Sequence, residues 1–322
     1  MIAFGKQNLD IVVVHSYHKG FVWSEKVEQG FLSKLSNEYD VTVAKKFYLN
    51  AKLNPSGVPK ESESILNQLG DIKYNLLFTT DDEAFASIGK KVLNNGKLVV
   101  FAGMNKSLSD YGISDLNKNY FNLSGVLEKY EILPLFRLIS DIFPSSRRIK
   151  ILSDDSETAK GVIGNLNNEL KGRNKHYGLI VENPVSSNKA SEWRRIIMNL
   201  KKDDILVILP FSNIKGTNAD KLNNSKEISE WIVKMNKNPE FATSSLTMDF
   251  GFFAAIGIDA FEHGEDAALS FIFSQNESQR DLRITEKNYA RLNFNANRAK
   301  DLGVVIPFEL LSYSHALVRN RK

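Results

Sequence analysis

The sequence contains no cysteine among its 322 residues. This absence excludes disulfide bonds, thiolate metal sites and a cysteine nucleophile, and it is compatible with a protein outside the cytoplasm. No run of about 18 apolar residues occurs, so the sequence predicts no membrane-spanning helix. Residues 1–9 lack a basic segment followed by an apolar core and so do not form a signal peptide. We therefore expect either a cytoplasmic protein or a mature chain whose leader has been trimmed.

The distribution of charge and the absence of catalytic and nucleotide-binding motifs argue against further classes of function. The 42 basic and 38 acidic residues are spread along the chain without a basic block, so we expect no nucleic-acid partner. The pairs Arg147-Arg148 and Arg194-Arg195 are interpreted as solvated ends of helices or strands. The five histidines are scattered, and no Gly-x-Ser-x-Gly, P-loop or Gly-x-Gly-x-x-Gly motif is present. We therefore expect no enzyme, no metal site and no cofactor.

The stretch from Ile11 to Leu35 organises the rest of the chain. It begins with the β-branched run Ile11 to Val14, which predicts a buried strand, and continues through a polar and aromatic loop. A helix then starts at Ser24, with Val27, Phe31 and Leu35 at helical spacing. Strand, loop and helix in this order are typical of an open α/β sheet, in which ligands bind beyond the carboxyl ends of the strands.

Strands and helices then alternate in two series, and the length alone suggests two domains of about 150 residues. The predicted strands are 40–44, 75–79, 98–102, 148–152, 176–181 and 204–209. The predicted helices are 24–38, 60–69, 82–93, 132–142, 158–170, 191–200 and 227–236. This alternation predicts two Rossmann-like lobes with parallel sheets.

The last third of the chain does not continue the alternation. Residues 247–257 are small and apolar, as expected where a chain passes between packed lobes. A helix over 261–273, a strand over 289–293, a short helix over 295–302 and a final helix over 307–318 are predicted to follow.

The run from Ala290 to Pro307 combines an asparagine-containing strand with Ala-Lys, Leu-Gly and Ile-Pro pairs. It resembles the closing motif of the ABC-type substrate-binding proteins with the type 1 periplasmic-binding fold, a bacterial family that includes tryptophan- and tyrosine-type binders. Three further stretches resemble that family in the same order, and they are residues 100–105, 125–128 and 257–268.

The resemblance implies an α/β fold of two lobes joined by a three-strand hinge. Lobe 1 would hold residues 1–123 and 250–284, and lobe 2 would hold residues 124–249 and 285–322. It also implies a periplasmic or otherwise extracytoplasmic protein that captures a small solute between its lobes and delivers it to a membrane permease. An amino acid or a similar zwitterion is the implied solute, and an aromatic one agrees with the rings in the strand-end loops.

A second role remains open. The opening His15-Ser16-Tyr17, with Trp23 and Gly30, is similar to family members that serve as extracytoplasmic sensor domains. Such a domain would be fused to a transmembrane signalling output of the histidine kinase or diguanylate cyclase type. The basic ending Arg319-Asn320-Arg321-Lys322 is compatible with that fusion.

The first strand-end loop supplies His15, Ser16, Tyr17 and Trp23 as ligand-binding candidates. Their rings could stack on a flat ligand, and Ser16 could donate a hydrogen bond. The alternative is that the rings cover the end of lobe 1 and pack on its first helix.

The later loops of lobe 1 supply four more candidates. Thr80 and Asp81 could bind a carboxylate and an amine, or they could cap the following helix, which contributes about 1 kcal/mol. Gly103 and Asn105 end the next strand, where the backbone could approach either the ligand or the crossover.

Lobe 2 is expected to face the same ligand with an equivalent loop. Asp154, Asp155 and Ser156 could contact the ligand or cap the next helix. Phe211 could form an opposing aromatic wall or simply close the core. Asp259 could bind the ligand or form a salt bridge at the middle hinge.

Overall fold

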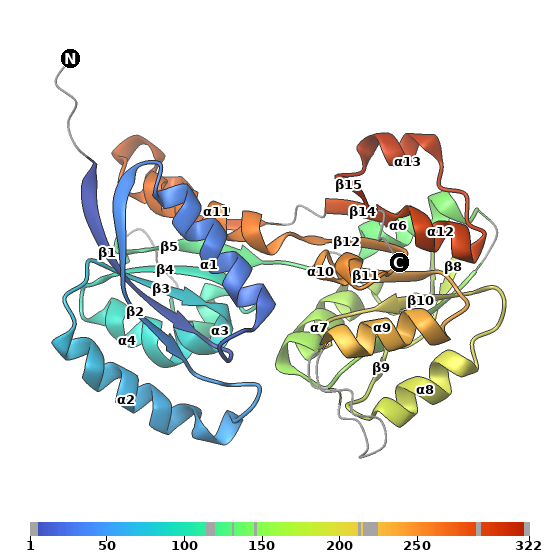
Figure 1. Cartoon of the computed structure of the whole chain (residues 1–322), viewed down its shortest axis with the longest axis horizontal. Helices are drawn as coiled ribbons and strands as arrows, with labels where there is room; N and C mark the ends of the chain where they lie inside the picture. The colour runs from blue at the N-terminus through green and yellow to red at the C-terminus, as the bar shows by residue number, and fades with distance from the viewer. Residues whose placement is uncertain are drawn as a thin grey trace. The chain divides into compact units, whose positions relative to one another are not determined.

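The computed structural model describes residues 6–113, 120–130, 132–144, 147–211, 214, 225–287 and 291–318. The chain forms two compact units, and it passes from one to the other three times. Unit 1 comprises Met1–Lys129 and Ala260–Lys287, and unit 2 comprises Tyr130–Asp259 and Asn288–Lys322. Each unit has a mainly parallel sheet with helices on its faces, as predicted (Figure 1). Within the described residues, no helix combines the length and apolar character needed to cross a membrane.

Unit 1 contains a six-stranded parallel sheet in the order β13-β5-β4-β3-β1-β2. Its strands are β1 (Gln7–His15), β2 (Tyr39–Tyr48), β3 (Leu76–Thr80), β4 (Leu98–Met104), β5 (Leu123–Glu128) and β13 (Ile284–Lys287). Its helices are α1 (Val22–Leu35), α2 (Val58–Asp71), α3 (Asp81–Ala84), α4 (Lys90–Asn94) and α11 (Ala260–Ser274). A π-helical turn, Phe85–Gly89, joins α3 to α4, and 3-10 turns lie at Pro55–Gly57, Leu108–Tyr111 and Glu277–Arg283.

Alternate residues of β1 serve the two faces of this sheet. Val12 and Val14 belong to the core beneath α2 and the 81–94 helical segment, whereas Ile11 and Val13 belong to the core beneath α1 and α11. Helices α1 and α11 lie side by side (Figure 1). Their close approach requires glycine, because a Cβ on Gly30 would lie 1.8 Å from the carbonyl oxygen of Phe261.

Unit 2 contains a nine-stranded sheet in the order β15-β14-β12-β11-β10-β6-β8-β7, with β9 also pairing with β6. Its strands are β6 (Arg148–Ser153), β7 (Lys175–His176), β8 (Leu179–Val181), β9 (Val185–Ser186), β10 (Asp204–Ile208), β11 (Glu240–Ser244), β12 (Ala254–Ile258), β14 (Arg291–Asn295) and β15 (Ala316–Val318). Its helices are α6 (Leu133–Ile142), α7 (Glu157–Leu170), α8 (Ala190–Met198), α9 (Ser225–Met235), α10 (Leu246–Asp249), α12 (Ala296–Leu302) and α13 (Phe308–Tyr313).

Unit 2 also has a hydrophobic core on each face of its sheet. Ile149 and Ile151 of β6 pack with α6 and α7 on one face, and Leu152 packs with α8 and α9 on the other. Trp193 is the largest fully buried side chain of the second core. Its indole N–H donates to the carbonyl of Ser187 (2.8 Å), which satisfies the one polar group of the ring.

Three predicted elements differ from the structure. The strand over 176–181 is a short hairpin, because Tyr177 and Gly178 adopt positive φ and reverse the chain between β7 and β8. The final helix ends at Tyr313, and the chain then extends to pair β15 with β14. Residues 254–258 form strand β12, so their small size serves packing within a sheet: a Cβ on Gly257 would lie 2.2 Å from the carbonyl oxygen of Thr243.

The unit boundaries also differ from the predicted lobe boundaries at 123, 249 and 284. Strands β5 and β13 pair with each other in the sheet of unit 1, although the prediction placed nearly all of β5 and most of β13 in lobe 2. Strand β12 pairs with β11 and β14 in unit 2, although the prediction placed it in lobe 1. The predicted breaks fall before or within strands whose backbone hydrogen bonds bind them to a sheet.

Candidate functional site

In each sheet the strand order reverses at one strand, so that the strands that follow it in the chain lie on both sides of it. In unit 1 this strand is β1, which lies between β2 and β3, and in unit 2 it is β6, which lies between β8 and β10. The crevice beyond the carboxyl ends of such strands is the usual ligand site of an open α/β sheet. Apart from Trp23 in α1, the predicted site residues of lobe 1 lie at the carboxyl ends of β1, β3 and β4 or just beyond them, so the parallel sheet brings them to one edge.

His15 ends β1 and is buried, with 1% of its surface exposed. Its Nε2 lies 2.9 Å from Glu28 Oε2, its Nδ1 lies 3.0 Å from Thr80 Oγ1, and its ring stacks on Tyr48. Burial acts to raise the pKa of Glu28, but hydrogen bonds from His15 and Lys46 hold that pKa below its usual value. Both nitrogens of the His15 ring are thus engaged within unit 1, which favours a supporting role behind the strand ends.

Ser16 and Thr80 join β1 to β3 at the same edge. The Ser16 hydroxyl donates to the carbonyl of Thr80 (2.7 Å) and accepts the backbone N–H of Ala84 (2.8 Å). The side chain of Ser16 therefore holds the first turn of α3 against the end of β1. Both residues are buried and position the next residue, Asp81.

Asp81 is a buried carboxylate in a left-handed backbone conformation, with φ of 65°. This conformation is uncommon for a residue other than glycine, and strained backbone of this kind clusters at functional sites. Burial raises the pKa of Asp81 to about 7; Lys52 opposes the rise, Asp82 adds to it, and hydrogen bonds from Ser24 and Thr80 oppose it. The Ser24 hydroxyl is 3.3 Å from Asp81 Oδ2, so this hydrogen bond is long.

The neighbouring Asp82 has a different task. Its Oδ2 accepts the backbone N–H of Asn105 (3.0 Å), and its Oδ1 accepts the backbone N–H of Lys106 (3.1 Å) and the hydroxyl of Tyr111 (2.6 Å). Asp82 therefore fixes the loop that follows β4. The amide of Asn105 also donates to Asp82 and to the carbonyl of Gly103, so Asn105 forms part of this loop's own bonding.

Gly103 lies between two acidic side chains at the end of β4. A Cβ at this position would be 3.5 Å from Asp81 Oδ1 and 3.7 Å from Glu128 Oε2, and φ is +79°. Its backbone N–H donates to Nε2 of His263 (3.0 Å) from α11, and the ring of Trp23 lies beside that histidine at 6.3 Å. The absence of a side chain at Gly103 thus keeps the edge open next to Asp81.

Tyr17 forms part of an aromatic pair that holds a cation. Its ring meets Phe21 edge-on at 4.6 Å. The ammonium of Lys52 lies 3.9 Å from the centroid of Tyr17 and 4.3 Å from that of Phe21. Because Lys52 also lowers the pKa of Asp81, a positive and a negative group act on each other at this edge.

The equivalent loop of unit 2 contains hydrogen bonds among its own residues. Oδ1 of the buried Asp154 accepts the backbone N–H (2.9 Å) and the hydroxyl (2.5 Å) of Ser156. Ser156 is the N-cap of α7, and its hydroxyl accepts the backbone N–H of Ala159 (3.2 Å). Asp155 is exposed, and its backbone N–H donates to Asn188 (2.9 Å). These contacts agree with the capping alternative for Asp154 and Ser156.

The remaining two candidates also lie at strand ends of unit 2. Phe211 follows β10, is partly buried, and packs against Trp193 at 5.8 Å. Asp259 follows β12 and is partly exposed. Their predicted contacts with a ligand remain predictions.

Three residues from other elements also reach the edge of unit 1 and were not predicted from the sequence. Lys52 lies in the connection after β2, Ser24 lies in the first turn of α1, and His263 comes from α11, far away in the sequence. Only the position of Lys52 just after a strand that neighbours β1 could have signalled its place. Among the described residues, no three His, Asp or Glu side chains are grouped so that they could hold a metal ion.

Comparison with known families gives one match that covers most of the chain. The profile of a family described as ABC transporter substrate binding protein matches residues 24–318. The comparison with curated proteins gives no match.

Solved structures of similar fold cover nearly the whole chain. An ABC domain from Streptococcus pneumonia in complex with L-Trp has a TM-score of 0.69 at 18% identity, with 97% of this chain and 100% of that chain covered. A conserved domain protein from Vibrio cholerae has a TM-score of 0.69 at 16% identity, covering 96% and 99%. The ligand-free, open form of a substrate binding protein with adhesive properties from Clostridium difficile has a TM-score of 0.67 at 16% identity, covering 97% and 100%. At these identities the likeness establishes the fold.

Proposed function

The chain belongs to the family of ABC transporter substrate binding proteins, and from this premise we propose that it captures an amino acid or a similar zwitterion. Proteins of this family bind small molecules outside the cytoplasm and pass them to a membrane permease. The structural neighbour that holds L-Trp supports an amino acid as the class of solute. We place the recognition of its charged groups at the carboxyl edge of the unit 1 sheet.

One observation carries the proposal: a buried carboxylate and a lysine ammonium act on each other at one edge, beside two aromatic faces. Asp81 would accept hydrogen bonds from the ammonium of the solute. Lys52 would pair with its carboxylate. Tyr17 and Phe21 would cover a flat or apolar side chain, because aromatic faces bury large areas and attract cations.

The energetics of Asp81 favour this assignment. A buried charge is unfavourable unless it is paired and hydrogen-bonded. The hydrogen bond from Ser24 is long, at 3.3 Å, and the pKa of Asp81 is raised by burial to about 7. An ammonium group from a solute would add a cationic hydrogen-bond donor to Asp81 and return the carboxylate to its ionised form.

The test is a thermal-shift screen of the purified chain against amino acids, nucleosides, sugars and small carboxylates. A solute at about 100 times its dissociation constant adds about 2.7 kcal/mol to the free energy of unfolding, which gives a clear rise in melting temperature. We expect the rise with amino acids, and the largest rise with aromatic ones. A rise only with sugars or nucleosides would contradict the proposal.

A matched pair of variants locates the site. Asp81→Asn removes the charge but keeps the shape, and we expect it to weaken amino-acid binding by about 10- to 100-fold, since hydrogen bonds to charged groups contribute about 1.5–3 kcal/mol. Asp71→Asn makes the same chemical change at an exposed position at the end of α2. Equal affinity of the two variants would place the site elsewhere.

A further inference from the structure

At the amino ends of its strands, the sheet of unit 2 brings together basic residues that are separate in the sequence. Arg147 and Arg148 precede or begin β6, while Lys201 and Lys202 lie just before β10. The backbone register sets Lys175 of β7 opposite Ile180, Ile180 opposite Arg148, and Arg148 opposite Asp204. One row across four strands thus joins the basic residues around 148, 175 and 201. In the sequence Arg147-Arg148 is an isolated pair, because this row exists only in the folded sheet.

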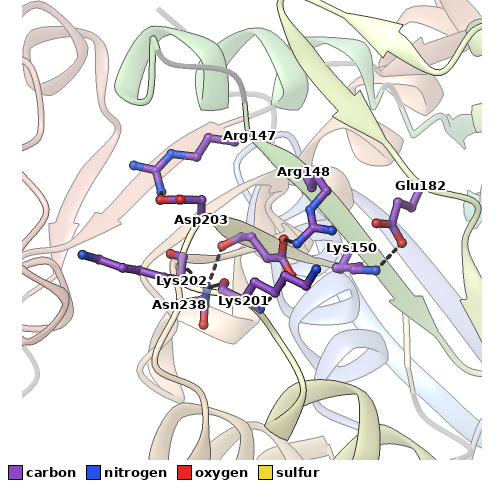
Figure 2. Close-up of polar contacts among 9 residues, drawn as sticks. Arg147, Arg148, Lys150, Glu182, Lys201, Lys202, Asp203 and Asn238 are labelled. Carbon is purple, nitrogen blue, oxygen red and sulfur yellow. Dashed lines mark hydrogen bonds and ion pairs between the residues drawn. The ribbon is translucent and has the colours of Figure 1, made fainter.

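The acidic side chains at this edge form ion pairs with the basic residues nearest the sheet. Arg147 pairs with Asp203 (3.0 Å), Arg148 with Asp204 (2.7 Å), and Lys150 with Glu182, as Figure 2 shows for the labelled pairs. The outer cations are Lys171, Arg173, Lys175, Lys201 and Lys202, which we call the basic edge. All five are exposed, and none forms an ion pair with another described residue.

The backbone around Lys201 and Lys202 of the basic edge is held in place. The side-chain amide of Asn238 donates to the carbonyls of Lys201 (2.6 Å) and Asp204 (2.8 Å) (Figure 2). The backbone N–H of Lys201 donates to Asp204 Oδ2 (2.8 Å), which closes the turn. The charges of Lys201 and Lys202 are therefore presented from a turn that is fixed to the sheet.

The charge is unequally divided between the two units. Unit 1 has 18 basic and 20 acidic residues, a net charge of −2, and unit 2 has 24 basic and 18 acidic residues, a net charge of +6. The excess of unit 2 attracts anionic surfaces, and this attraction acts over a Debye length of about 8–10 Å at physiological salt.

We propose that the basic edge of unit 2 docks on an anionic phospholipid surface. The inference rests on membership of a family that works beside a membrane permease, and it does not depend on which solute is bound. Lysine predominates in the basic edge, whereas the cores of protein interfaces are depleted in lysine. Tyr177, 50% exposed, follows Lys175 in the hairpin turn, and Met198, 58% exposed, ends the helix before Lys201. Single exposed rings and apolar side chains among lysines suit the headgroup region of a bilayer.

The basic edge lies at the amino ends of the strands, whereas Asp154 and Phe211 lie at their carboxyl ends. Docking on lipid would therefore leave the carboxyl edge of unit 2 uncovered. Membrane contact and solute capture are expected to be independent for this reason.

The experiment is co-sedimentation of the full chain with vesicles of phosphatidylcholine, alone or mixed in equal parts with phosphatidylglycerol. We expect binding only to the mixed vesicles, and we expect added salt to weaken it. The variant Lys175→Gln/Lys201→Gln/Lys202→Gln should bind about a hundredfold more weakly, since each basic residue near an anionic bilayer contributes about 1 kcal/mol.

The control removes the same net charge from unit 1 with Lys60→Gln/Lys73→Gln/Lys91→Gln, three exposed lysines in or beside α2 and α4. This variant should keep at least half of the vesicle binding. Tyr177→Ser should reduce binding severalfold with no change in net charge. Equal losses in the two triple variants, or binding to pure phosphatidylcholine, would overturn the proposal. Absence of vesicle binding would also overturn it and would point to an acidic protein partner.

The solute screen separates this inference from the proposed function. The lysine variants of the basic edge should keep the melting-temperature rise given by an amino acid, and Asp81→Asn should keep vesicle binding. A chain that binds no amino acid but still sediments with anionic vesicles would refute only the proposed function.

Discussion

A buried carboxylate in unit 2 and one in unit 1 differ in how completely they are paired and hydrogen-bonded. In unit 2, Arg298 donates to both oxygens of Glu240 at 2.7 and 2.9 Å, and Asn236 and the backbone of Phe253 add further hydrogen bonds. In unit 1, Asp81 has a long hydrogen bond from Ser24 and another from Thr80, and the positive charge of Lys52 acts on it electrostatically. Removing the partner of a paired buried acid is strongly destabilising, whereas a buried acid with weaker pairing is unfavourable in its ionised form.

The same contrast holds between the two Asp-Asp pairs that follow β3 and β6. Asp154 accepts two hydrogen bonds from Ser156, the N-cap of its own helix. Asp81 is turned by its left-handed backbone toward residues distant in sequence. Identical dipeptides at the ends of buried strands thus differ in their backbone conformation and in their hydrogen-bond partners.

Removal of the partner of Glu240 should have the largest effect. Arg298→Met leaves a buried charge uncompensated, and we expect it to lower the free energy of unfolding by about 3–5 kcal/mol. Urea denaturation followed by circular dichroism would measure the loss. Arg195→Met, at an exposed arginine of α8 that is 3.7 Å from Glu192, should change stability by less than about 0.5 kcal/mol. Similar losses in both variants would mean that the buried pair of Arg298 and Glu240 matters no more for stability than an exposed ion pair.

Asp81→Asn should stabilise the fold at high pH. The pKa of Asp81 is raised from 3.8 to about 7, so the folded chain holds this proton more tightly than the unfolded chain. The stability from this group is fully present below about pH 4 and is lost as the pH rises through about 7. The variant should therefore gain up to about 4 kcal/mol over the native chain at pH 8, and little near pH 4.

Thermal denaturation at both pH values would measure this difference, with Asp71→Asn as the control. The control should change stability equally at the two pH values. A gain in stability for Asp81→Asn that does not depend on pH would mean that the pKa of Asp81 is not raised in the folded chain.

Ser156→Ala should produce a moderate loss in unit 2. It removes the N-cap of α7 and one of the two hydrogen bonds to Asp154, and we expect a loss of about 1–2 kcal/mol. Asp155→Asn, at the exposed neighbour, should change stability by less than about 0.5 kcal/mol. If Asp155→Asn is the more destabilising change, the capping role assigned to this loop is wrong.

Lys52→Met should have the smallest effect on stability. Loss of the positive charge should raise the pKa of Asp81 further, because Lys52 lowers it. The pH at which the stability from Asp81 is lost should therefore move upward by less than about one unit. Lys60→Met, at an exposed position of α2, should leave that pH unchanged, and a downward shift with Lys52→Met would contradict the assigned contact.

Much of the fold follows from the sequence because buried strands and amphipathic helices have clear periodicity. The run Ile11 to Val14 and the spacing of Val27, Phe31 and Leu35 predicted β1 and α1 correctly, and the family resemblance is confirmed by the match over residues 24–318. The hairpin at Tyr177 was missed because positive φ at a tyrosine has no sequence signal.

The candidate site was only partly predictable. Strand ends can be located from the sequence, so Ser16, Thr80, Asp81 and Gly103 were expected at one edge, and the parallel sheet brings them there. The engagement of His15 with Glu28 and the approach of Lys52 to Tyr17 depend on the packing of side chains from other elements. No spacing rule gives such contacts.

The most direct test of this account is the affinity for an amino acid measured by calorimetry from about pH 5 to about pH 8. The charged groups of an amino acid do not titrate in this range, so any change reports on the protein. We predict an affinity that is constant above about pH 7 and falls about tenfold per unit below it, with this dependence lost in Asp81→Asn. An affinity of the native chain that is the same throughout this range would contradict the role of Asp81.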